Sequence, residues 1–356
     1  MTNSYVKLGD LATYINGYAF KPKDRGDKGL PIIRIQDLTG NTYDKGFYDG
    51  KYPSKIEINN GDVLISWSAS LGVYLWNGGK ALLNQHIFKV IFDKKEIDKD
   101  YFIYAVRFSL KRLHQLTHGA TMKHIVKKDF DNVVIPYPSI KKQKEIAFNL
   151  DKIESIIKTR QQEIRMLDTL IKARFVEMFG DPICNSKNKS TTKFINVVKL
   201  QRGFDLPIRK RNTQGKIPVY GSNGVLGYHD EFKASSGIIT GRSGTIGKVY
   251  YENNEFWPLN TALFSVKTYG NNIIYLKYLV SLFKLERFCN GAGVPTLNRN
   301  DVHKQKIIDI PIKEQNKFAS FVQQVDKSKV VNASIMKYII SIRFYLYFKE
   351  NKEGAR

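Results

Sequence analysis

Residues 62–72 read DVLISWSASLG, and residues 237–247 read GIITGRSGTIG. Each stretch is a short apolar run, rich in aliphatic and β-branched residues, that passes into a loop of serine and glycine. This pattern is typical of a strand followed by a turn. The second stretch begins 175 positions after the first (62 to 237). Two copies of one strand-and-loop segment indicate an internal repeat, which decides the architecture before any other feature of the sequence.

Further matches occur in the same order on both sides of these segments. Residues 83–90 (LNQHIFKV) align with residues 259–266 (LNTALFSV) in an L-N-x-x-aliphatic-F-x-V pattern. The remaining matches pair single residues of the two halves: Lys7, Leu11, Gly17 and Tyr18 with Lys193, Val197, Gly203 and Phe204; Gly119, Ala120 and Asp129 with Gly291, Ala292 and Asp301; and Ile140, Lys141 and Gln143 with Ile312, Lys313 and Gln315.

The matched segments are separated by sequence that has diverged. Residues 21–60 and 207–235 share little with each other. A constant framework with variable insertions is the pattern of one scaffold that carries two different readers. Identical readers would predict two identical half-sites, so unlike readers predict an asymmetric target.

A long helix is predicted after each half of the repeat. The spacing of apolar residues alternates between four and three, which is typical of a coiled-coil seam. A core helix of a single bundle would show the same stripe. A coiled coil is favoured because both segments occupy equivalent places and exceed the average helix of roughly 11 residues. The predicted seams are Ile146, Leu150, Ile153, Ile157, Arg160, Ile164, Leu167, Ile171, Arg174 and Met178, and then Phe318, Val322, Val325, Lys329, Asn332, Met336, Ile339, Arg343 and Leu346.

The layout predicted for the chain is therefore globular domain, helix, globular domain, helix. Gly180, Asp181 and Pro182 are expected to end the first long helix. One shorter helix is expected in each globular domain, over residues 100–116 and 273–288. The fold class is α+β, with two globular domains in a pseudo-two-fold repeat and the long helices pairing as an antiparallel coiled coil. The predicted boundaries are 1–138 and 183–310 for the globular domains, and 139–182 and 311–356 for the helices.

The composition predicts a folded protein with a polyanionic partner. The 356 residues are 42% hydrophobic and 12% aromatic, and the formal net charge is +24. Such an excess of Lys and Arg favours binding to phosphate backbones, because counterions are released. No apolar run of roughly 18 residues and no signal peptide are recognisable, so a soluble cytoplasmic protein without membrane contact is expected. Cys184 and Cys289 have neither metal-ligand nor disulfide spacing.

Several motifs together resemble the specificity subunit of type I restriction-modification enzymes. They are PSIKKQ at residues 138–143, PIKEQ at 311–315, IPVYGSNG at 217–224 and KARFVEMFGDP at 172–182. The resemblance covers nearly the whole chain. It implies target recognition domains that bind duplex DNA, helices that pair antiparallel, and attached partner subunits. Those partners would be two DNA adenine methyltransferase subunits and, in a complete system, restriction or translocase subunits. S-adenosylmethionine and ATP would bind the partners, so no cofactor is expected on this chain.

Motifs for catalysis are not found. Residues 241–249 (GRSGTIGKV) differ from a phosphate-binding loop because five residues separate the outer glycines where four are needed, and Val249 replaces the Ser or Thr that would bind magnesium. Asp181-Pro182-Ile183 lacks the second proline and the aromatic residue that amino-methyltransferases use to hold a flipped base. The six histidines form no set with the spacing of metal ligands. The chain is therefore expected to be non-catalytic and to hold no metal.

Candidate DNA contacts are polar and aromatic residues in expected loops, since such side chains read base edges or bind phosphates. A solvated surface residue is the alternative for each of them. Asn84 and Asn260 share a motif and are expected to serve the scaffold, whereas positions that differ between the halves, such as Trp67 and Arg242, are better candidates for specificity. The candidates are Lys23, Arg25, Arg34, Gln36, Ser66, Trp67, Ser68, Gln85, His86, Thr121 and Lys123 in the first half, and Arg202, Arg209, Arg211, Tyr220, Ser222, Asn223, Arg242, Ser243, Thr245, Thr296, Asn298 and Arg299 in the second.

Three functions are compatible with these features. The first is a sequence-specific subunit that recognises a bipartite asymmetric DNA target and directs methyltransferase and restriction subunits to it; an orphan specificity protein acting only with a methyltransferase is a variant of this hypothesis. The second is a self-contained enzyme that modifies nucleic acid, which the missing motifs disfavour. The third is a nucleic-acid-binding protein without sequence preference, which the divergent loops disfavour.

Overall fold

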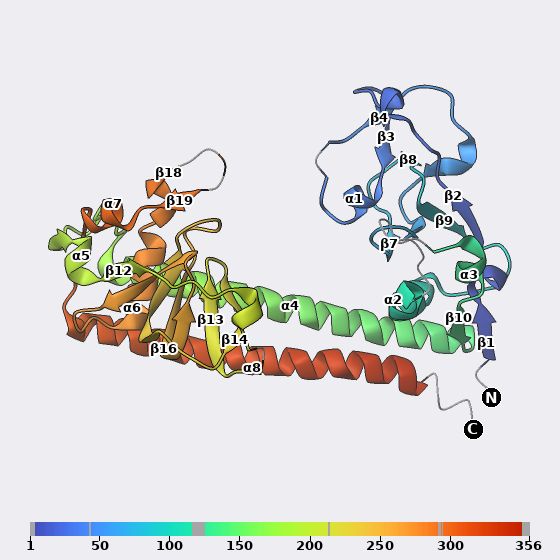
Figure 1. Ribbon diagram of the computed structural model, residues 1–356. Helices are drawn as coiled ribbons and strands as arrows, with labels where there is room; N and C mark the ends of the chain where they lie inside the picture. Colours follow the sequence, from blue (N-terminus) through green and yellow to red (C-terminus); the bar gives the residue numbers. More distant parts are fainter. Residues whose placement is uncertain are drawn as a thin grey trace. The chain divides into compact units, whose positions relative to one another are not determined.

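The computed structural model describes residues 4–42, 44–115, 125–212, 214–290, 293 and 295–350, without the side chains of residues 111, 112, 115 and 344–350. The chain divides into two compact units. The first unit comprises Met1–Lys158 with Met336–Arg356, and the second comprises Thr159–Ile335. Each unit combines small sheets and short helices with part of two long helices, α4 (Ile140–Phe179) and α8 (Ile312–Glu350) (Figure 1). The predicted α+β class is confirmed.

Two four-stranded sheets form the body of the first unit. The strand orders are β2-β9-β6-β7 and β4-β3-β8-β5, and only β3 and β8 pair in parallel among the named strands of this unit. Phe88 and Val90 pack with Phe102 and Val106 of α2 in one buried cluster. The elements are β1 (Ser4–Lys7), β2 (Thr13–Asn16), β3 (Leu30–Ile33), α1 (Ile35–Leu38), β4 (Phe47–Tyr48), β5 (Glu57–Ile58), β6 (Val63–Ser66), β7 (Gly72–Leu75), β8 (Ala81–Leu83), β9 (Ile87–Ile91), α2 (Lys99–Gln115), α3 (Lys127–Asp131) and β10 (Val134–Tyr137), with one-turn helices at Leu8–Asp10 (η1), Pro22–Asp24 (η2) and Ser54–Ile56 (η3).

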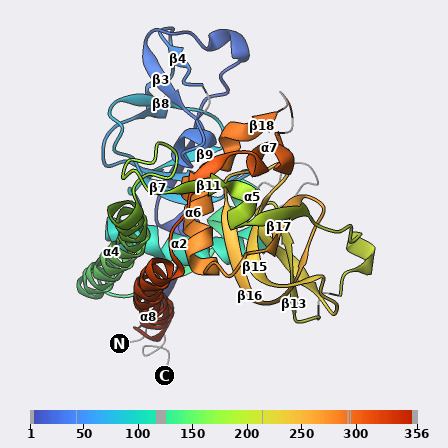
Figure 2. The same cartoon turned by 90° about the vertical axis from the view of Figure 1, so that its left-hand side faces the viewer.

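A single six-stranded sheet forms the body of the second unit, in the order β12-β17-β15-β16-β13-β14. The long strand β16 occupies the place of both β7 and β8 of the first unit. Helix α6 lies against β15 and β16 (Figure 2). The elements are β11 (Thr191–Lys193), α5 (Phe194–Val197), β12 (Lys199–Arg202), η4 (Ile208–Lys210), β13 (Ile217–Gly221), β14 (Gly224–His229), β15 (Ala234–Gly241), β16 (Val249–Pro258), β17 (Ala262–Lys267), α6 (Ile273–Leu282), η5 (Leu285–Phe288), β18 (Cys289–Asn290), β19 (Thr296–Leu297), α7 (Arg299–His303) and β20 (Lys306–Ile308).

The two units repeat the same strand pairings. The three strands β2-β9-β6 correspond to β12-β17-β15, and every one of these pairs is antiparallel. The parallel pair β3-β8 corresponds to β13-β16. The outer pairs β1-β10 and β11-β20 also correspond. The predicted internal repeat is therefore a repeat of backbone architecture.

One detail of the predicted alignment is wrong by one residue. The backbone N–H of Gly17 donates to the carbonyl of Ile87 at 3.1 Å, and that of Gly203 donates to Ala262 at 3.1 Å. Ile87 therefore corresponds to Ala262, whereas the shared letters L-N align it with Leu263. A shift of one residue moves a strand side chain to the opposite face of its sheet. The backbone pairing, rather than the letters, sets the correspondence.

The matched glycines lie where two backbone segments meet. A Cβ atom on Gly17 would lie 2.0 Å from the carbonyl oxygen of Asn84. A Cβ atom on Gly203 would lie 2.3 Å from the carbonyl oxygen of Leu259. Both distances are far below van der Waals contact, and the obstructing atoms belong to the backbone. Only glycine fits at this crossing, which explains the match between the halves.

A buried glutamine fastens the start of each long helix. Gln143 accepts the backbone N–H of Asp98 at 2.8 Å and donates to the Pro138 carbonyl at 2.8 Å. Gln315 accepts the N–H of Asn272 at 2.9 Å and donates to the Ile310 carbonyl at 2.7 Å. These side chains are 0% and 1% exposed. Their hydrogen bonds satisfy backbone groups that burial would otherwise leave unpaired.

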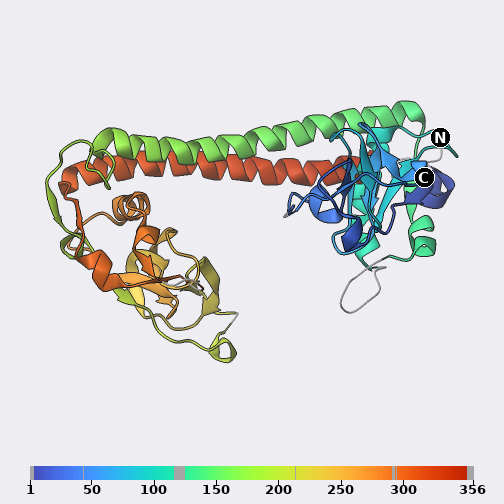
Figure 3. The same cartoon turned by 90° about the horizontal axis from the view of Figure 1, so that it is seen from above.

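The long helices α4 and α8 lie side by side (Figure 3). All ten seam positions predicted on α4 are buried or half-buried, as are the first eight of the nine on α8; the side chain of Leu346 lies outside the description. Gly180, with φ of +84°, follows the last residue of α4. This left-handed conformation ends the helix as predicted.

Polar residues that interrupt the predicted seam of α8 face polar partners on α4. In the second unit, Lys329 Nζ lies 2.6 Å from Asp168 Oδ1, and Arg160 Nη1 donates to Asn332 Oδ1 at 3.3 Å. Residue numbers fall on α8 as they rise on α4, so the pairing is antiparallel. The polar breaks are therefore matched layers of the helix pair.

The first unit contains a similar layer. Arg343 Nη1 lies 2.5 Å from Glu154 Oε1. The guanidinium of Arg343 also lies over the ring of Phe108 on α2, at 5.8 Å from its centroid. This contact ties the end of α8 to the globular part of its own unit. Among the described residues, no helix is both long and apolar enough to span a bilayer.

Candidate nucleic-acid interface

An open pocket in the second unit brings three separate segments together. It is lined by Arg202 at the end of β12, Arg242 after β15, and residues 296–299 at β19 and the start of α7, with Leu263 completing the wall. Five of its seven lining residues are predicted DNA contacts. No acidic side chain lines it. A cationic, partly apolar pocket of this kind suits the edge of a base or a phosphate.

The backbone holds Arg242 firmly in this pocket. Its N–H donates to the carbonyl of Thr261 at 2.8 Å, and its own carbonyl accepts the N–H of Leu297 at 2.8 Å. Its guanidinium Nη1 donates to the carbonyl of Asn260 at 3.1 Å. The side chain is half-buried. Arg242 is thus fixed at both backbone and side chain, with most of its donors unused.

The same backbone position in the first unit is Trp67. Its N–H donates to the carbonyl of His86 at 3.1 Å, and its carbonyl accepts the N–H of Ile125 at 3.0 Å. The indole Nε1 donates to Asn16 Oδ1 at 3.1 Å. Asn16 is the last residue of β2, as Arg202 is the last residue of β12. The pair Asn16 and Trp67 therefore occupies the place of Arg202 and Arg242.

The aromatic surroundings of Trp67 complete the contrast. Its ring lies 4.8 Å from His86 and stacks at 5.7 Å on Phe88, measured between centroids. His86 has φ of +73°, a left-handed conformation that is unusual for a residue with a side chain. The first unit thus has the half-buried rings of Trp67 and His86, packed edge-on to each other over buried Phe88, where the second has guanidinium groups.

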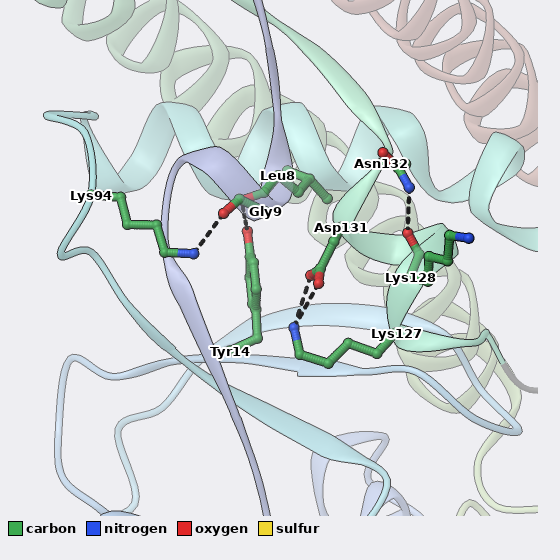
Figure 4. A network of polar contacts seen from close by, with 8 residues as sticks. All are labelled: Leu8, Gly9, Tyr14, Lys94, Lys127, Lys128, Asp131 and Asn132. Atoms are coloured by element: carbon green, nitrogen blue, oxygen red, sulfur yellow. Dashed lines mark hydrogen bonds and ion pairs between the residues drawn. The ribbon is translucent and has the colours of Figure 1, made fainter.

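Short helices beside these positions are anchored differently. In the first unit, Lys127 of α3 forms an ion pair with Asp131 at 2.8 Å (Figure 4). Tyr14 lies beside them, and its hydroxyl donates to the carbonyl of Leu8 at 2.9 Å. Burial raises the pKa of the Tyr14 hydroxyl, with a smaller contribution from Asp131. Lys127 is therefore paired within its own unit, whereas Lys128 beside it is exposed.

The equivalent positions in the second unit are Arg299 and His303. Nε2 of buried His303 accepts the N–H of Leu200 at 3.0 Å, so this nitrogen carries no proton. Burial lowers the pKa of His303, and Arg299 and Lys199 lower it further. Since position 303 holds no carboxylate, Arg299 forms no ion pair with any residue that the structure describes. This leaves Arg299 available at the rim of the pocket.

A second basic site follows the scaffold glycine in each unit. The one-turn helices η2 and η4 begin five residues after Gly17 and Gly203. Exposed Lys23 and Arg25 in the first unit take the places of Arg209 and Arg211 in the second. The similarity of the two units therefore extends into a segment predicted to have diverged. Lys23, Arg25 and Arg209 are exposed and placed to contact a phosphate backbone, whereas half-buried Arg211 donates from Nε and Nη2 to the carbonyl of Leu206 at 3.3 and 3.2 Å.

Comparison with known proteins identifies the family. The sequence profile described as "Type I restriction modification DNA specificity domain" matches residues 2–166 and 186–337. The chain belongs to this family. It is 26% identical over 170 residues to the EcoBI type I restriction enzyme specificity subunit of Escherichia coli, covering 47% of this chain and 35% of that protein. It is 28% identical over 264 residues to the MjaVIII specificity subunit of Methanocaldococcus jannaschii, covering 71% and 58%.

The chain therefore spans about a third of the length of the Escherichia coli relative and a little over half of the length of the Methanocaldococcus jannaschii relative. A solved structure of the S subunit of a type I restriction-modification system from M. genitalium covers 98% of this chain and 99% of its own, with a TM-score of 0.56 and 15% identity. At this identity the likeness concerns the fold.

Four predicted contacts do not fit a DNA-facing role because the fold buries them. Arg34, Ser66, Ser68 and Tyr220 are 8%, 1%, 1% and 7% exposed. Arg34 bonds to the Asp44 carbonyl and lies 3.5 Å from Asp37. Ser66 donates to the carbonyl of Ser70 at 2.5 Å. The local sequence predicts surface loops at these positions, whereas the tertiary structure buries all four side chains.

Tyr220 illustrates this error. Its hydroxyl donates to Glu252 Oε2 at 3.1 Å, and its ring belongs to a buried cluster with Phe256 and Phe264. Burial raises the pKa of this hydroxyl, and Glu252 raises it further. The sequence SNG at residues 222–224 forms a turn, but Tyr220 lies within strand β13, which ends at Gly221.

The other predictions remain compatible with DNA contact to different degrees. Asn298 caps α7 by accepting the N–H of Asn300 at 3.0 Å, and Asn223 accepts from Lys248 at 2.8 Å. Thr121 and Lys123 lie outside the described residues. The following predicted contacts are half-buried or exposed in the structure: Gln36, Gln85, Ser222, Ser243, Thr245 and Thr296.

Asn16 is the residue that the sequence reasoning missed. It immediately precedes Gly17, as Arg202 precedes Gly203, so the repeat itself contained the signal. No group of three or more His, Cys, Asp or Glu side chains suited to a metal is found in the described part of the chain. Residues 241–249 connect β15 to strand β16 rather than to the helix that a phosphate-binding loop requires.

Proposed function

We propose that this chain is the DNA-binding specificity subunit of a type I restriction-modification complex and that it recognises a bipartite, asymmetric target. The observation that carries the proposal is the exchange of Trp67 for Arg242 at one fixed backbone position. The same hydrogen bonds hold both residues. Since their side chains offer different chemistry to DNA, the two half-sites should differ. Residues 1–138 and 183–310 would be the two target recognition domains.

The complex would include subunits that perform the chemistry. A methyltransferase would supply the S-adenosylmethionine site, and a restriction subunit, where present, would supply the ATP site. Two methyltransferase copies suit the two recognition domains. A self-contained enzyme is the alternative, and it predicts methylation or cleavage by the pure chain. We expect none with S-adenosylmethionine or ATP alone, whereas addition of the cognate methyltransferase should give methylation at one defined sequence.

Binding should depend steeply on salt. The net charge of +24 favours many phosphate contacts, each of which releases counterions. For six to ten contacts, affinity is expected to fall by roughly 10³ to 10⁵ between 50 and 200 mM salt. Filter binding or fluorescence anisotropy of duplex DNA would measure this. A flat response, or equal affinity for target and scrambled duplex, would contradict the proposal.

The helix pair would set the unread spacer between half-sites. Seven residues of helix correspond to about 10 Å, or up to about three base pairs. Deleting residues 158–164 from α4 together with residues 331–337 from α8 removes matched segments of the antiparallel pair. Methylation mapping should then show a shorter spacer with both half-sites unchanged. Deletion from α4 alone is the control, and it should abolish methylation. Altered half-site sequences in the double deletion would exclude a spacer role.

A further inference from the structure

We infer that Arg242 reads a guanine in the half-site bound by the second unit, and that Arg202 and Arg299 hold the flanking phosphates. This inference rests on the proposed function and adds the base and the roles of three arginines. Arginine can donate two parallel hydrogen bonds to the O6 and N7 acceptors of guanine in the major groove. No other base presents two acceptors there in that arrangement.

The placement of Arg242 suits it for reading a base. Its guanidinium uses one donor on the carbonyl of Asn260, at 3.1 Å. The remaining N–H groups keep their planar arrangement and are available to a ligand. Because the backbone at Arg242 is held on both sides by hydrogen bonds of 2.8 Å, little conformational freedom would be lost on binding. A prepositioned planar donor favours recognition of a single base edge.

Arg202 and Arg299 are placed differently from Arg242. The Arg202 side chain is 51% exposed, and its Nη2 lies 3.7 Å from Asp205, which is itself 70% exposed. Such a loose ion pair leaves the side chain free to move. Arg299 is the first residue of α7 and has no ion-pair partner among the described residues. Mobile cations at the rim of a pocket suit phosphates, which need charge more than exact direction.

The walls of the pocket support this division. Leu263 and Leu297 are 1% and 2% exposed and form its apolar part, while Thr296 adds a polar group at the edge. An apolar wall strengthens hydrogen bonds to a bound base by excluding water.

The first unit provides an internal comparison. Trp67 has a single N–H donor, which is already bonded to Asn16 at 3.1 Å. It cannot form the paired contact that Arg242 offers. We therefore expect no guanine requirement at the corresponding base of the first half-site.

Selection from a random duplex library, using the chain together with its methyltransferase, tests the inference. The wild type should enrich a bipartite sequence with one invariant guanine in one half-site. Arg242→Gln should reduce discrimination at that base by roughly 5- to 150-fold, with the other half-site unchanged. Arg242→Lys keeps the charge and can still donate to O6 and N7, but it loses the planar fork, so it should retain only part of the discrimination while binding random DNA as the wild type does. Arg202→Gln and Arg299→Gln should weaken binding to all sequences alike.

Two controls separate the explanations. Lys327→Gln removes one exposed charge from α8 and should leave both affinity and preference unchanged. Thermal unfolding of Arg242→Gln should match the wild type, which would exclude a folding defect. Uniform weakening by Arg242→Gln, or wild-type discrimination at that base by Arg242→Gln, would overturn the guanine assignment. Failure of the wild type to enrich any sequence would instead overturn the proposed function.

Discussion

The second unit places Arg202 and Arg242 where the first places Asn16 and Trp67. The backbone hydrogen bonds of the two sites are the same, and only the side chains differ. The indole of Trp67 is bonded within its own unit, whereas most donors of Arg242 remain available. The scaffold and the reading surface are therefore separable, because backbone pairing holds a position while its side chain determines what is bound.

A second contrast concerns the short helices beside these positions. Lys127 of α3 forms an ion pair with Asp131, whereas Arg299 at the same place in α7 has His303 in the position of Asp131. At this position the first unit pairs its cation, with Lys128 beside it exposed, and the second leaves Arg299 at the pocket. The comparison predicts equal responses to changes in the scaffold and unequal responses to changes beside the pocket.

Loss of the buried glutamines should have the largest effect. Gln143→Leu and Gln315→Leu each leave a half-buried N–H and a buried carbonyl without a partner. Each orphaned group costs about 1 to 3 kcal/mol, so the unit concerned should lose roughly 2 to 6 kcal/mol of stability. Hydrogen exchange resolved by peptide would measure each unit separately. Lys141 and Lys313 lie two positions before these glutamines and are exposed, so Lys141→Leu and Lys313→Leu are matched controls that should change stability little. A large loss in one unit only would break the equivalence of the scaffolds.

Alanine at the scaffold glycines tests the same equivalence by another route. A Cβ atom at Gly17 or Gly203 would collide with backbone carbonyls, and such overpacking typically costs about 1 to 3 kcal/mol. Chemical denaturation followed by peptide-resolved exchange should show similar losses in the two units. Gly26→Ala and Gly293→Ala have room for the added atom and serve as controls. Stability unchanged by Gly203→Ala would show that the backbone crossing is looser in the second unit.

The polar layers of the helix pair should differ modestly in strength. Side-chain exposures are 22% and 34% for Arg343 and Glu154, but 18% and 57% for Lys329 and Asp168. Exposed ion pairs contribute at most about 1 kcal/mol, so both couplings should be small and the first larger. Double-mutant cycles with Glu154→Gln and Arg343→Gln, and with Asp168→Asn and Lys329→Gln, would measure them. A larger coupling at Asp168 would reverse this order.

Low pH should reduce the stability of the second unit more than that of the first, because His303 lies in α7 of the second unit. The pKa of His303 lies below its ordinary value of 6.5 in the folded protein, chiefly because the side chain is buried. Between that lowered pKa and 6.5, the unfolded chain binds more protons, so stability falls as the pH drops below about 6.5. Amide hydrogen-exchange protection factors in the second unit, compared near pH 7.5 and near pH 5.5, should show this loss of stability.

His303→Gln removes the titrating group and can still accept a hydrogen bond from Leu200. The acid-dependent loss in the second unit should therefore become smaller in this variant. The first unit, with Asp131 at the equivalent place, is the internal reference. An unchanged acid response in His303→Gln would assign the effect to other groups.

The sequence by itself determined the repeat, the α+β class and the course of the long helices. Helical periodicity and the glycine at position 180 are local signals, so α4 ends as predicted. The predicted shorter helices were also found, at Lys99–Gln115 and at Ile273–Leu282 with a final turn at Leu285–Phe288. The matched residues Gln143 and Gln315 were visible as a pattern, although their hydrogen bonds were not.

Tertiary structure alone decided the register and the burial of the reading positions. The shared letters L-N align Ile87 with Leu263. The hydrogen bonds that Gly17 and Gly203 donate show instead that Ile87 is equivalent to Ala262. Register depends on partners distant in the chain, and a slip of one residue leaves local composition unchanged while reversing the side-chain faces. Contacts between distant segments also bury Tyr220 in the core and bring Arg202, Arg242 and Arg299 into one pocket, although the first and the last lie 97 positions apart (202 to 299).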